Sequence, residues 1–400
     1  MCAAEAVSQC VGCKAVAYCS RTCQKAHWKA GHKGRCFSPE NRAALNSPAN
    51  RAQLVNAARR GAAAEVIDLA TRGVDVNYEH GGSADRAGAT PLSIAAENGH
   101  DPVVRALLDA GADKDHTDRA SRTTLYVAAW KGYTTIVRAL LDAGADKDLA
   151  ASDGSTPLCA AAQNGHDAVV RALIDAGANK DNADKTGRTA LYVAAGKGHA
   201  TIARALLDAG ADTDHALNRT TPLYIAAFHG HDAIVRALLD AGADKNRPSK
   251  DGATPLYAAA VHGHEACVRA LLDAGADKDR ATNDGNTPLF IAAQDGHDAI
   301  ARALLDTGAD IDLADKESAT PLYIAVQNGH GTIARALLDA GADKDRAMKN
   351  GLTPLIFASG TGQIDLARAL LSAGADTRKT YLGKTALEHA RTAEMRELLG

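Results

Sequence analysis

One phrase recurs along almost the whole chain and strongly limits what the chain can fold into. The copy at position 320 reads TPLYIAVQNGHGTIARALLDAGADKD. The copies begin at Thr90, Thr123, Thr156, Thr189, Thr221, Thr254, Thr287, Thr320, Thr353 and Thr385. Successive copies lie 33 residues apart, except for the steps from 189 to 221 and from 353 to 385, which are 32. With a weaker copy near Ala52 the chain holds eleven units, and such a period predicts units that stack to bury their apolar faces.

Each unit predicts two short helices. Threonine suits the N-cap of the first helix, and proline suits its first position because no N–H is needed there. Leucine, isoleucine and alanine then form an apolar stripe over about two turns. Gly-His ends this helix, and "DAIVRALLDAG" predicts a second helix that ends at a left-handed glycine. The aspartates and glycine that follow predict an extended turn, and the histidines predict turn residues bonded to local backbone.

The period, the T-P-L phrase and the GADxD phrase resemble the ankyrin repeat family over residues 52–400. This resemblance implies a mostly α solenoid of helix-turn-helix units with β-hairpin-like fingers. It also implies a concave protein-binding face that includes the two positions before each Gly-His. Most of these positions hold polar residues here, but a few are apolar. The predicted partner-binding residues are Trp130, Phe228, His229, Val261 and His262, and random drift of a solvated surface is the competing interpretation.

A dense cluster of metal-type ligands precedes the repeats. Positions 10 to 36 read CVGCKAVAYCSRTCQKAHWKAGHKGRC, whereas the chain after them holds only Cys159 and Cys267, which we expect to be buried structural thiols. Cysteine and histidine pairs at this spacing can chelate tetrahedral zinc. The cysteine spacing with the YCS, CQ and W–H–C elements resembles the MYND zinc finger over residues 2–36. This resemblance implies one zinc held by Cys10, Cys13, His32 and Cys36.

The resemblance also implies a second zinc, whose ligand set is one short. Cys19 and Cys23 belong to this site, and Cys2 fits as a third ligand. Three explanations stay open for the fourth: a chain that begins upstream of Met1, a degenerate site, or His27 as the ligand. In the family, the finger binds proline-containing peptides, and the equivalent groove positions are Gln24 and Trp28. For Trp28, packing against the zinc core is the alternative.

Charge and composition limit the classes of function and the cellular locations that we expect for the chain. The net charge is −3, but residues 1–42 hold seven Lys/Arg against two acidic residues, a net +5, which leaves −8 for the rest. No apolar run reaches the roughly 18 residues of a membrane span, and the first residues do not predict a signal peptide. We therefore expect an intracellular protein, cytoplasmic or nuclear.

These observations predict a small finger at 2–36, a linker at 37–51 and an eleven-unit array at 52–400, with atypical units as caps. Because the repeats leave no room for a catalytic fold, we expect no enzyme activity and no small-molecule substrate. The predicted function is a scaffold or adaptor whose finger binds a proline-containing peptide and whose array binds a second protein. The alternative is a nucleic-acid-associated transcriptional regulator that uses the basic finger.

Overall fold

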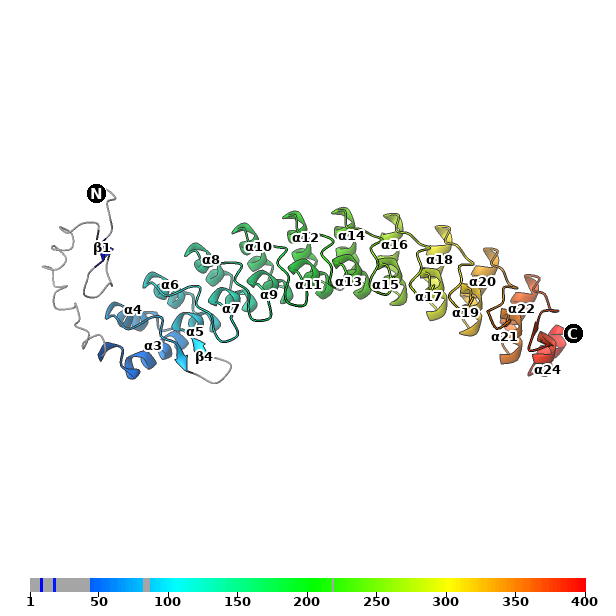
Figure 1. Cartoon of the computed structure of the whole chain (residues 1–400), viewed down its shortest axis with the longest axis horizontal. Helices are drawn as coiled ribbons and strands as arrows, with labels where there is room; N and C mark the ends of the chain where they lie inside the picture. The colour runs from blue at the N-terminus through cyan, green and yellow to red at the C-terminus, as the bar shows by residue number, and fades with distance from the viewer. Residues whose placement is uncertain (1–7, 10–16, 19–43, 82–86, 218) are drawn as a thin grey trace. The chain divides into compact units, whose positions relative to one another are not determined.

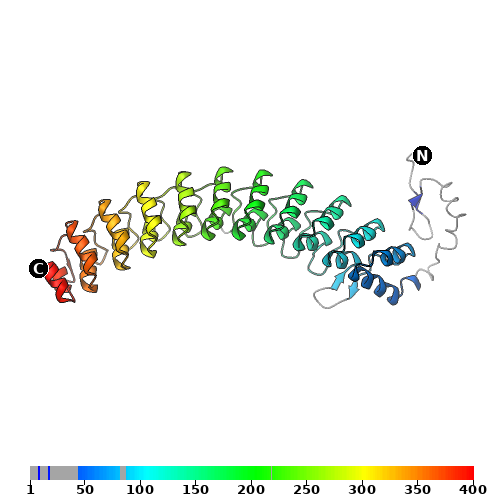
Figure 2. The same ribbon diagram turned by 180° about the vertical axis from the view of Figure 1, so that it is seen from behind.

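The computed structural model describes residues 8–9, 17–18, 44–81, 87–217 and 219–400. The chain forms two compact units, Met1–Lys185 (unit 1) and Thr186–Gly400 (unit 2). In each unit, first helices follow one another in one row and second helices in another (Figures 1 and 2). The mostly helical repeat fold predicted from the sequence is confirmed.

The helices come in pairs, one pair for each repeat. In unit 1 the first helices are α3 Pro48–Arg60, α5 Pro91–Glu97, α7 Thr124–Lys131 and α9 Pro157–Gln163, and the second helices are α4 Ala63–Thr71, α6 Asp101–Asp109, α8 Thr134–Asp142 and α10 Asp167–Asp175. In unit 2 the first helices are α11 Ala190–Lys197, α13 Pro222–His229, α15 Pro255–Val261, α17 Pro288–Asp295, α19 Pro321–Gln327, α21 Pro354–Thr361 and α23 Ala386–His389. The second helices of unit 2 are α12 Ala200–Asp208, α14 Asp232–Asp240, α16 Glu265–Asp273, α18 Asp298–Asp306, α20 Gly331–Asp339, α22 Ile364–Ser372 and α24 Ala393–Leu399.

Three antiparallel strand pairs complete the described elements: β1 Ser8–Gln9 with β2 Ala17–Tyr18, β3 His80–Gly81 with β4 Ala87–Ala89, and β5 Thr380–Tyr381 with β6 Lys384–Thr385. Helix α3 begins at Pro48 with Ser47 as its N-cap, inside the segment predicted as a linker.

The first helices begin as their sequence predicts. The Thr123 hydroxyl oxygen accepts a hydrogen bond from the Tyr126 backbone N–H at 3.1 Å, and the equivalent threonine caps most other first helices in the same way. Proline occupies the next position in most repeats, but α7 and α11 have Thr124 and Ala190 there. The Thr124 hydroxyl is buried and makes no hydrogen bond. A buried hydroxyl without a hydrogen-bond partner is a local departure from the repeat pattern.

The second helices end at a left-handed glycine. At the end of α8, Gly144 has φ +75°, and its N–H donates to the Leu141 carbonyl at 2.9 Å. The next N–H, from Ala145, reaches back to the Leu140 carbonyl at 2.9 Å. Together these bonds form a Schellman motif, which satisfies carbonyl groups at the helix end. The predicted glycine stop is therefore confirmed.

The core lies between the two rows of helices. In the repeat of α7 and α8, the side chains of Leu125, Ala128, Ile136, Val137 and Leu140 are at most 1% exposed. Burying one leucine or isoleucine side chain contributes about 1.5–3 kcal/mol. Since the same positions are apolar in neighbouring repeats, this core continues through each unit.

An aspartate ladder also joins successive repeats. In unit 2 the carboxylate of Asp279 accepts a hydrogen bond from the Asp310 backbone N–H at 2.8 Å, and Asp312 accepts one from Asp343 at 3.0 Å. Unit 1 repeats the arrangement where Asp115 accepts from the Asp146 N–H at 2.7 Å. These turn aspartates therefore link neighbouring repeats within each unit, in addition to shaping their own turns.

The histidines of the Gly-His phrase differ from their predicted role. The His166 Nε2–H donates to the carbonyl of Trp130, 36 residues earlier, at 3.0 Å, and His264 reaches the Phe228 carbonyl at 3.1 Å. Each of these imidazoles therefore bonds the preceding repeat, not its own turn. The prediction of local bonding was wrong because it considered one repeat by itself, whereas the acceptor belongs to the end of the preceding first helix.

Candidate protein-binding surface

The predicted partner-binding residues lie at the ends of first helices. Trp130 is on the last turn of α7 in unit 1, and its side chain is 45% exposed. In unit 2, Phe228 is half-buried near the end of α13, and Val261 is half-buried at the end of α15. His229 and His262 are exposed beside them. All five positions are therefore accessible to a partner.

In unit 2 the structure brings aromatic rings from two repeats together. The Phe228 ring meets the His262 imidazole edge to face, with 4.1 Å between ring centroids. The His229 imidazole lies 5.0 Å from the same ring, and the Tyr224 ring stacks 6.5 Å away on the same helix. We call Tyr224, Phe228, His229 and His262 the aromatic–histidine cluster. The repeat spacing predicted a patch of Phe228 with Val261, but it did not reveal that His262 contacts Phe228 directly.

The charge of this cluster depends on its neighbours. Burial lowers the pKa of His229, and His231, His262, His264 and Lys197 lower it further in that order. Burial likewise lowers the pKa of His262, with help from His264 and His297, while Asp295 acts in the opposite direction. Because an unperturbed histidine titrates near 6.5, both imidazoles are largely neutral at pH 7. The centre of this surface is therefore aromatic and uncharged at that pH.

Unit 1 presents a different surface at the equivalent position. The Lys131 ammonium lies 4.8 Å from the centroid of the Trp130 ring, a cation–π contact. The Trp130 backbone carbonyl is held by His166, as described above. A tryptophan fixed at its backbone and exposed at its ring is a typical anchor for a protein partner.

Tyrosine occupies the position three residues after the capping threonine in several repeats. Tyr126, Tyr192, Tyr224 and Tyr257 are half-buried, and burial raises the pKa of each phenol. Tyr323 is buried more fully, and its pKa is raised to about 12 by burial. These phenols stay protonated at physiological pH. The Tyr323 ring also packs against the Phe357 ring of the next repeat, with 5.9 Å between ring centroids.

The two cysteines of the array are structural. Cys159 and Cys267 are buried and form no disulfide. Burial raises the pKa of the Cys267 thiol to about 11, so it is almost wholly protonated at pH 7. Since the thiolate is the reactive form, burial keeps this thiol in its less reactive, protonated form at that pH.

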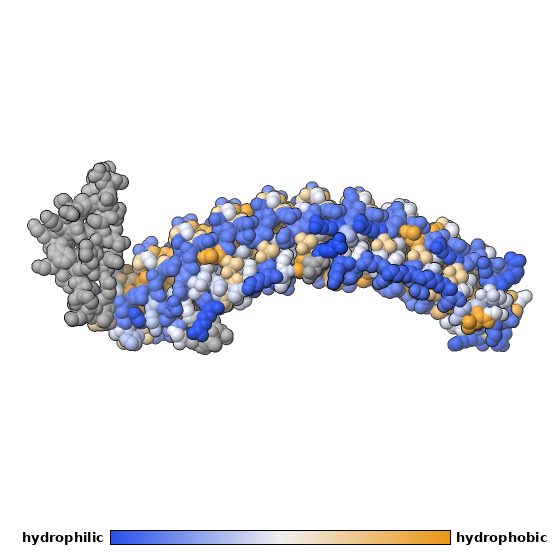
Figure 3. Space-filling model, in the orientation of Figure 1, coloured by the Kyte–Doolittle hydropathy of each residue, from blue (hydrophilic) through white to orange (hydrophobic). Residues whose placement is uncertain are grey.

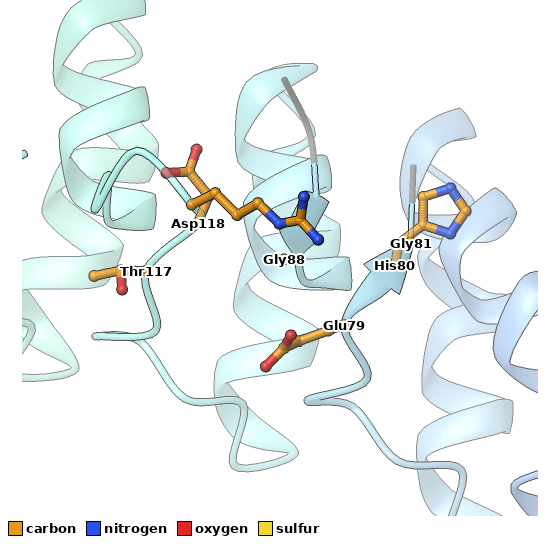
Figure 4. A pocket seen from close by; sticks show the side chains of 7 residues that line it. Glu79, His80, Gly81, Gly88, Thr117 and Asp118 are labelled. Atoms are coloured by element: carbon orange, nitrogen blue, oxygen red, sulfur yellow. The ribbon is translucent and has the colours of Figure 1, made fainter. Parts of the chain in front are cut away.

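A small pocket of about 240 Å³ lies beside the β3–β4 hairpin in unit 1. Figure 4 shows Glu79 and His80 on the hairpin side and Thr117 and Asp118 on the loop of the next repeat. The Asp118 carboxylate already pairs with the Arg122 guanidinium at 2.7 Å. The pocket is thus formed where the hairpin of one repeat meets the loop of the next.

The predicted finger residues lie outside the described parts of the chain: Cys2, Cys10, Cys13, Cys19, Cys23, Gln24, His27, Trp28, His32 and Cys36. Their zinc and peptide contacts stay predictions. Among the residues that the structure describes, no three histidine, cysteine or acidic side chains are grouped to hold a metal ion. Within the same residues, no helix combines the length and apolar character that a membrane crossing needs.

Few large hydrophobic side chains are exposed among the described residues: Ile67, Trp130, Leu149, Leu382 and Leu387. On the face drawn in Figure 3, hydrophilic residues cover most of each unit, and hydrophobic residues form small separate patches. Stacked helix pairs with a polar exterior and a few exposed aromatic side chains define the class of repeat proteins that bind other proteins.

Family comparisons agree with this class. The chain belongs to the ankyrin repeat family: models described as "Ankyrin repeats (3 copies)" match residues 54–151, 143–216, 211–282 and 274–348, and the single "Ankyrin repeat" model matches 350–380. A model described as "MYND finger" matches residues 1–36, so the chain is an ankyrin repeat protein with an N-terminal MYND zinc finger. Both modules are typically non-catalytic and engage other proteins, and MYND fingers typically bind zinc.

Two solved structures are similar to the array. The ankyrin repeat domain of Bcl-3, described as a unique member of the IkappaB protein family, is 32% identical, with 54% of this chain and 99% of that chain covered and a TM-score of 0.50. The human ASB11 ankyrin repeat domain is 30% identical, with 53% of this chain and 97% of that chain covered and a TM-score of 0.47. No curated protein matches the chain significantly.

Proposed function

We propose that this chain is a non-catalytic adaptor that holds two protein partners at once. The finger binds a proline-containing peptide, and the ends of the first helices bind a second protein. The observation that carries the proposal is the set of exposed or half-exposed apolar side chains, Trp130, Phe228 and Val261, at surface positions that are polar in most other repeats. Two linked modules strengthen binding to any partner that spans both.

The chemistry of the finger residues fits zinc as a structural ion. Thiolates and imidazoles are the usual ligands of closed tetrahedral zinc sites, and such sites hold small domains folded. Cys10, Cys13, His32 and Cys36 would hold one ion, and Cys19 and Cys23 with Cys2 would contribute to a second. His27 is the candidate for its fourth ligand within this sequence. Zinc would supply the folded platform that presents Gln24 and Trp28 to a peptide.

Variants that remove peptide binding by the finger and protein binding by the array separately test the proposal. The full chain is compared in quantitative affinity purification with Trp28→Ala and with the double variant Trp130→Gln, Phe228→Gln. Glutamine occupies the equivalent position in other repeats, at Gln163, Gln294 and Gln327, so the double variant keeps a side chain that the fold accepts. We expect each variant to lose a different set of bound proteins. If both variants retain every protein that binds the unmodified chain, the proposal is wrong.

A further inference from the structure

Four neighbouring first helices of unit 2 end in a row. The helices α11, α13, α15 and α17 contact one another in this order, and Figure 1 shows them side by side. Lys197, His229, His262 and Asp295 occupy equivalent positions at these helix ends in successive repeats. We define the unit 2 strip as Lys197, Phe228, His229, Val261, His262 and Asp295.

The ends of the strip carry opposite charges. Lys197 is exposed at the end of α11, and Asp295 is exposed at the end of α17. Both charges affect the histidines at the centre of the strip: Lys197 lowers the pKa of His229, whereas Asp295 raises the pKa of His262. An uncharged aromatic centre therefore lies between a cationic end and an anionic end. Such a distribution favours a partner with the complementary order of charges.

One side of Phe228 is open to a partner side chain. Toward the next repeat, the His262 imidazole packs against the Phe228 ring. In the preceding repeat, the equivalent of Phe228 is Gly196, which has no side chain to place beside the ring. A Cβ on Gly196 would lie 3.3 Å from Cγ1 of Ile225, which is tight packing against α13. Gly196 thus leaves no protruding side chain between Lys197 and Phe228.

We propose that the unit 2 strip binds an extended segment of a partner protein, with an acidic residue at Lys197, an apolar side chain on Phe228 and Val261, and a basic residue at Asp295. This inference rests on the proposed function and adds the chemistry of the array's partner. Three repeat steps separate the charged ends, about 30 Å at about 10 Å per packed helix. An extended segment rises about 3.3 Å per residue, so roughly nine residues span the strip. The acidic and basic residues of the partner are then about nine residues apart, with the apolar residue between them.

A library of random twelve-residue peptides displayed on phage, selected on the full chain, tests this proposal. We expect enriched peptides with an apolar centre between an acidic end and a basic end. Their affinity falls about thirtyfold in Phe228→Gln, as for a hot-spot side chain, and less in Val261→Gln. The charge-swapped variant Lys197→Asp, Asp295→Lys binds these peptides more weakly and prefers peptides with the reversed order of charges. Arg236→Gln, an exposed position on the second helix α14 of the same unit, is the matched control and leaves the affinity unchanged.

The outcomes separate this inference from the proposed function. Peptides that lose affinity in Phe228→Gln and follow the charge swap support the strip and its polarity. Peptides that bind Phe228→Gln and the swapped variant as tightly as the unmodified chain overturn the inference, while protein binding by the chain stands. If no peptide is enriched above a control surface that lacks the chain, the result counts against the strip and also against protein binding by the array. Circular dichroism of each variant shows whether the helices are retained.

Discussion

Replacing Thr124 by proline is expected to stabilise unit 1. Proline already occupies this first helical position in most other repeats, where its fixed φ suits the helix and its missing N–H costs nothing. The residue before it, Thr123, has φ −78° and ψ 165°, the extended geometry that a following proline requires. The backbone of α7 can therefore accept Thr124→Pro without rearrangement.

Two effects contribute to the expected gain. The Thr124 hydroxyl is buried without a partner, and removing an unsatisfied group of this kind recovers about 1–3 kcal/mol. Proline also reduces the freedom of the unfolded chain, which adds about 0.4–1 kcal/mol. In unit 2, Ala190 occupies the same position after Thr189 with φ −85° and ψ 169°, but it has no hydroxyl. Ala190→Pro should therefore gain only the smaller contribution.

Native-state hydrogen exchange measures this difference locally, which matters because repeat arrays do not always unfold in one step. We expect protection of the α7 and α8 amides to rise by about tenfold or more in Thr124→Pro, since 1.4 kcal/mol corresponds to a factor of ten. Thr124→Val removes the hydroxyl without the proline effect and should give most of the gain. Equal gains in Thr124→Pro and Ala190→Pro would show that the buried hydroxyl has no cost and would refute the reasoning.

The remaining predictions concern glycine, pH and zinc. Gly132→Ala should lower the free energy of unfolding, measured by chemical denaturation, more than Gly144→Ala does. Both glycines have positive φ, which costs an alanine about 1–2 kcal/mol. Only at Gly132 would the new Cβ also lie 2.6 Å from an imidazole of the next repeat. The free energy of unfolding of unit 2 should fall as pH drops below about 6.5, because the folded state lowers the pKa of His229 and His262 and the unfolded state then binds more protons. Replacing both by asparagine should flatten this dependence in pH-resolved denaturation; an unchanged slope would assign it to other groups. Elemental analysis of the chain should find two zinc ions, falling to about one in His27→Ala, if His27 completes the second site, and a count unaffected by the variant would exclude it.

Contacts within one repeat could be predicted from the sequence, because their residues are close along the chain. Thr123 and Gly144 are examples, since a cap and a helix stop depend on neighbours three to five residues away. Contacts between repeats were predicted less well. The bond from His166 to the Trp130 carbonyl and the packing of Phe228 on His262 join residues 36 and 34 positions apart. A period gives the spacing of such residues but not the direction of their side chains.

In the proposed adaptor, partners dock on the ends of the first helices. Hydrogen exchange of the full chain, with and without a bound partner protein recovered by affinity purification, locates the docking surface. We predict added protection at the C-terminal turns of α7, α13 and α15, while α8, α14 and α16 of the same repeats exchange as in the free chain. Protection confined to the second helices would show that partners do not dock on the ends of the first helices.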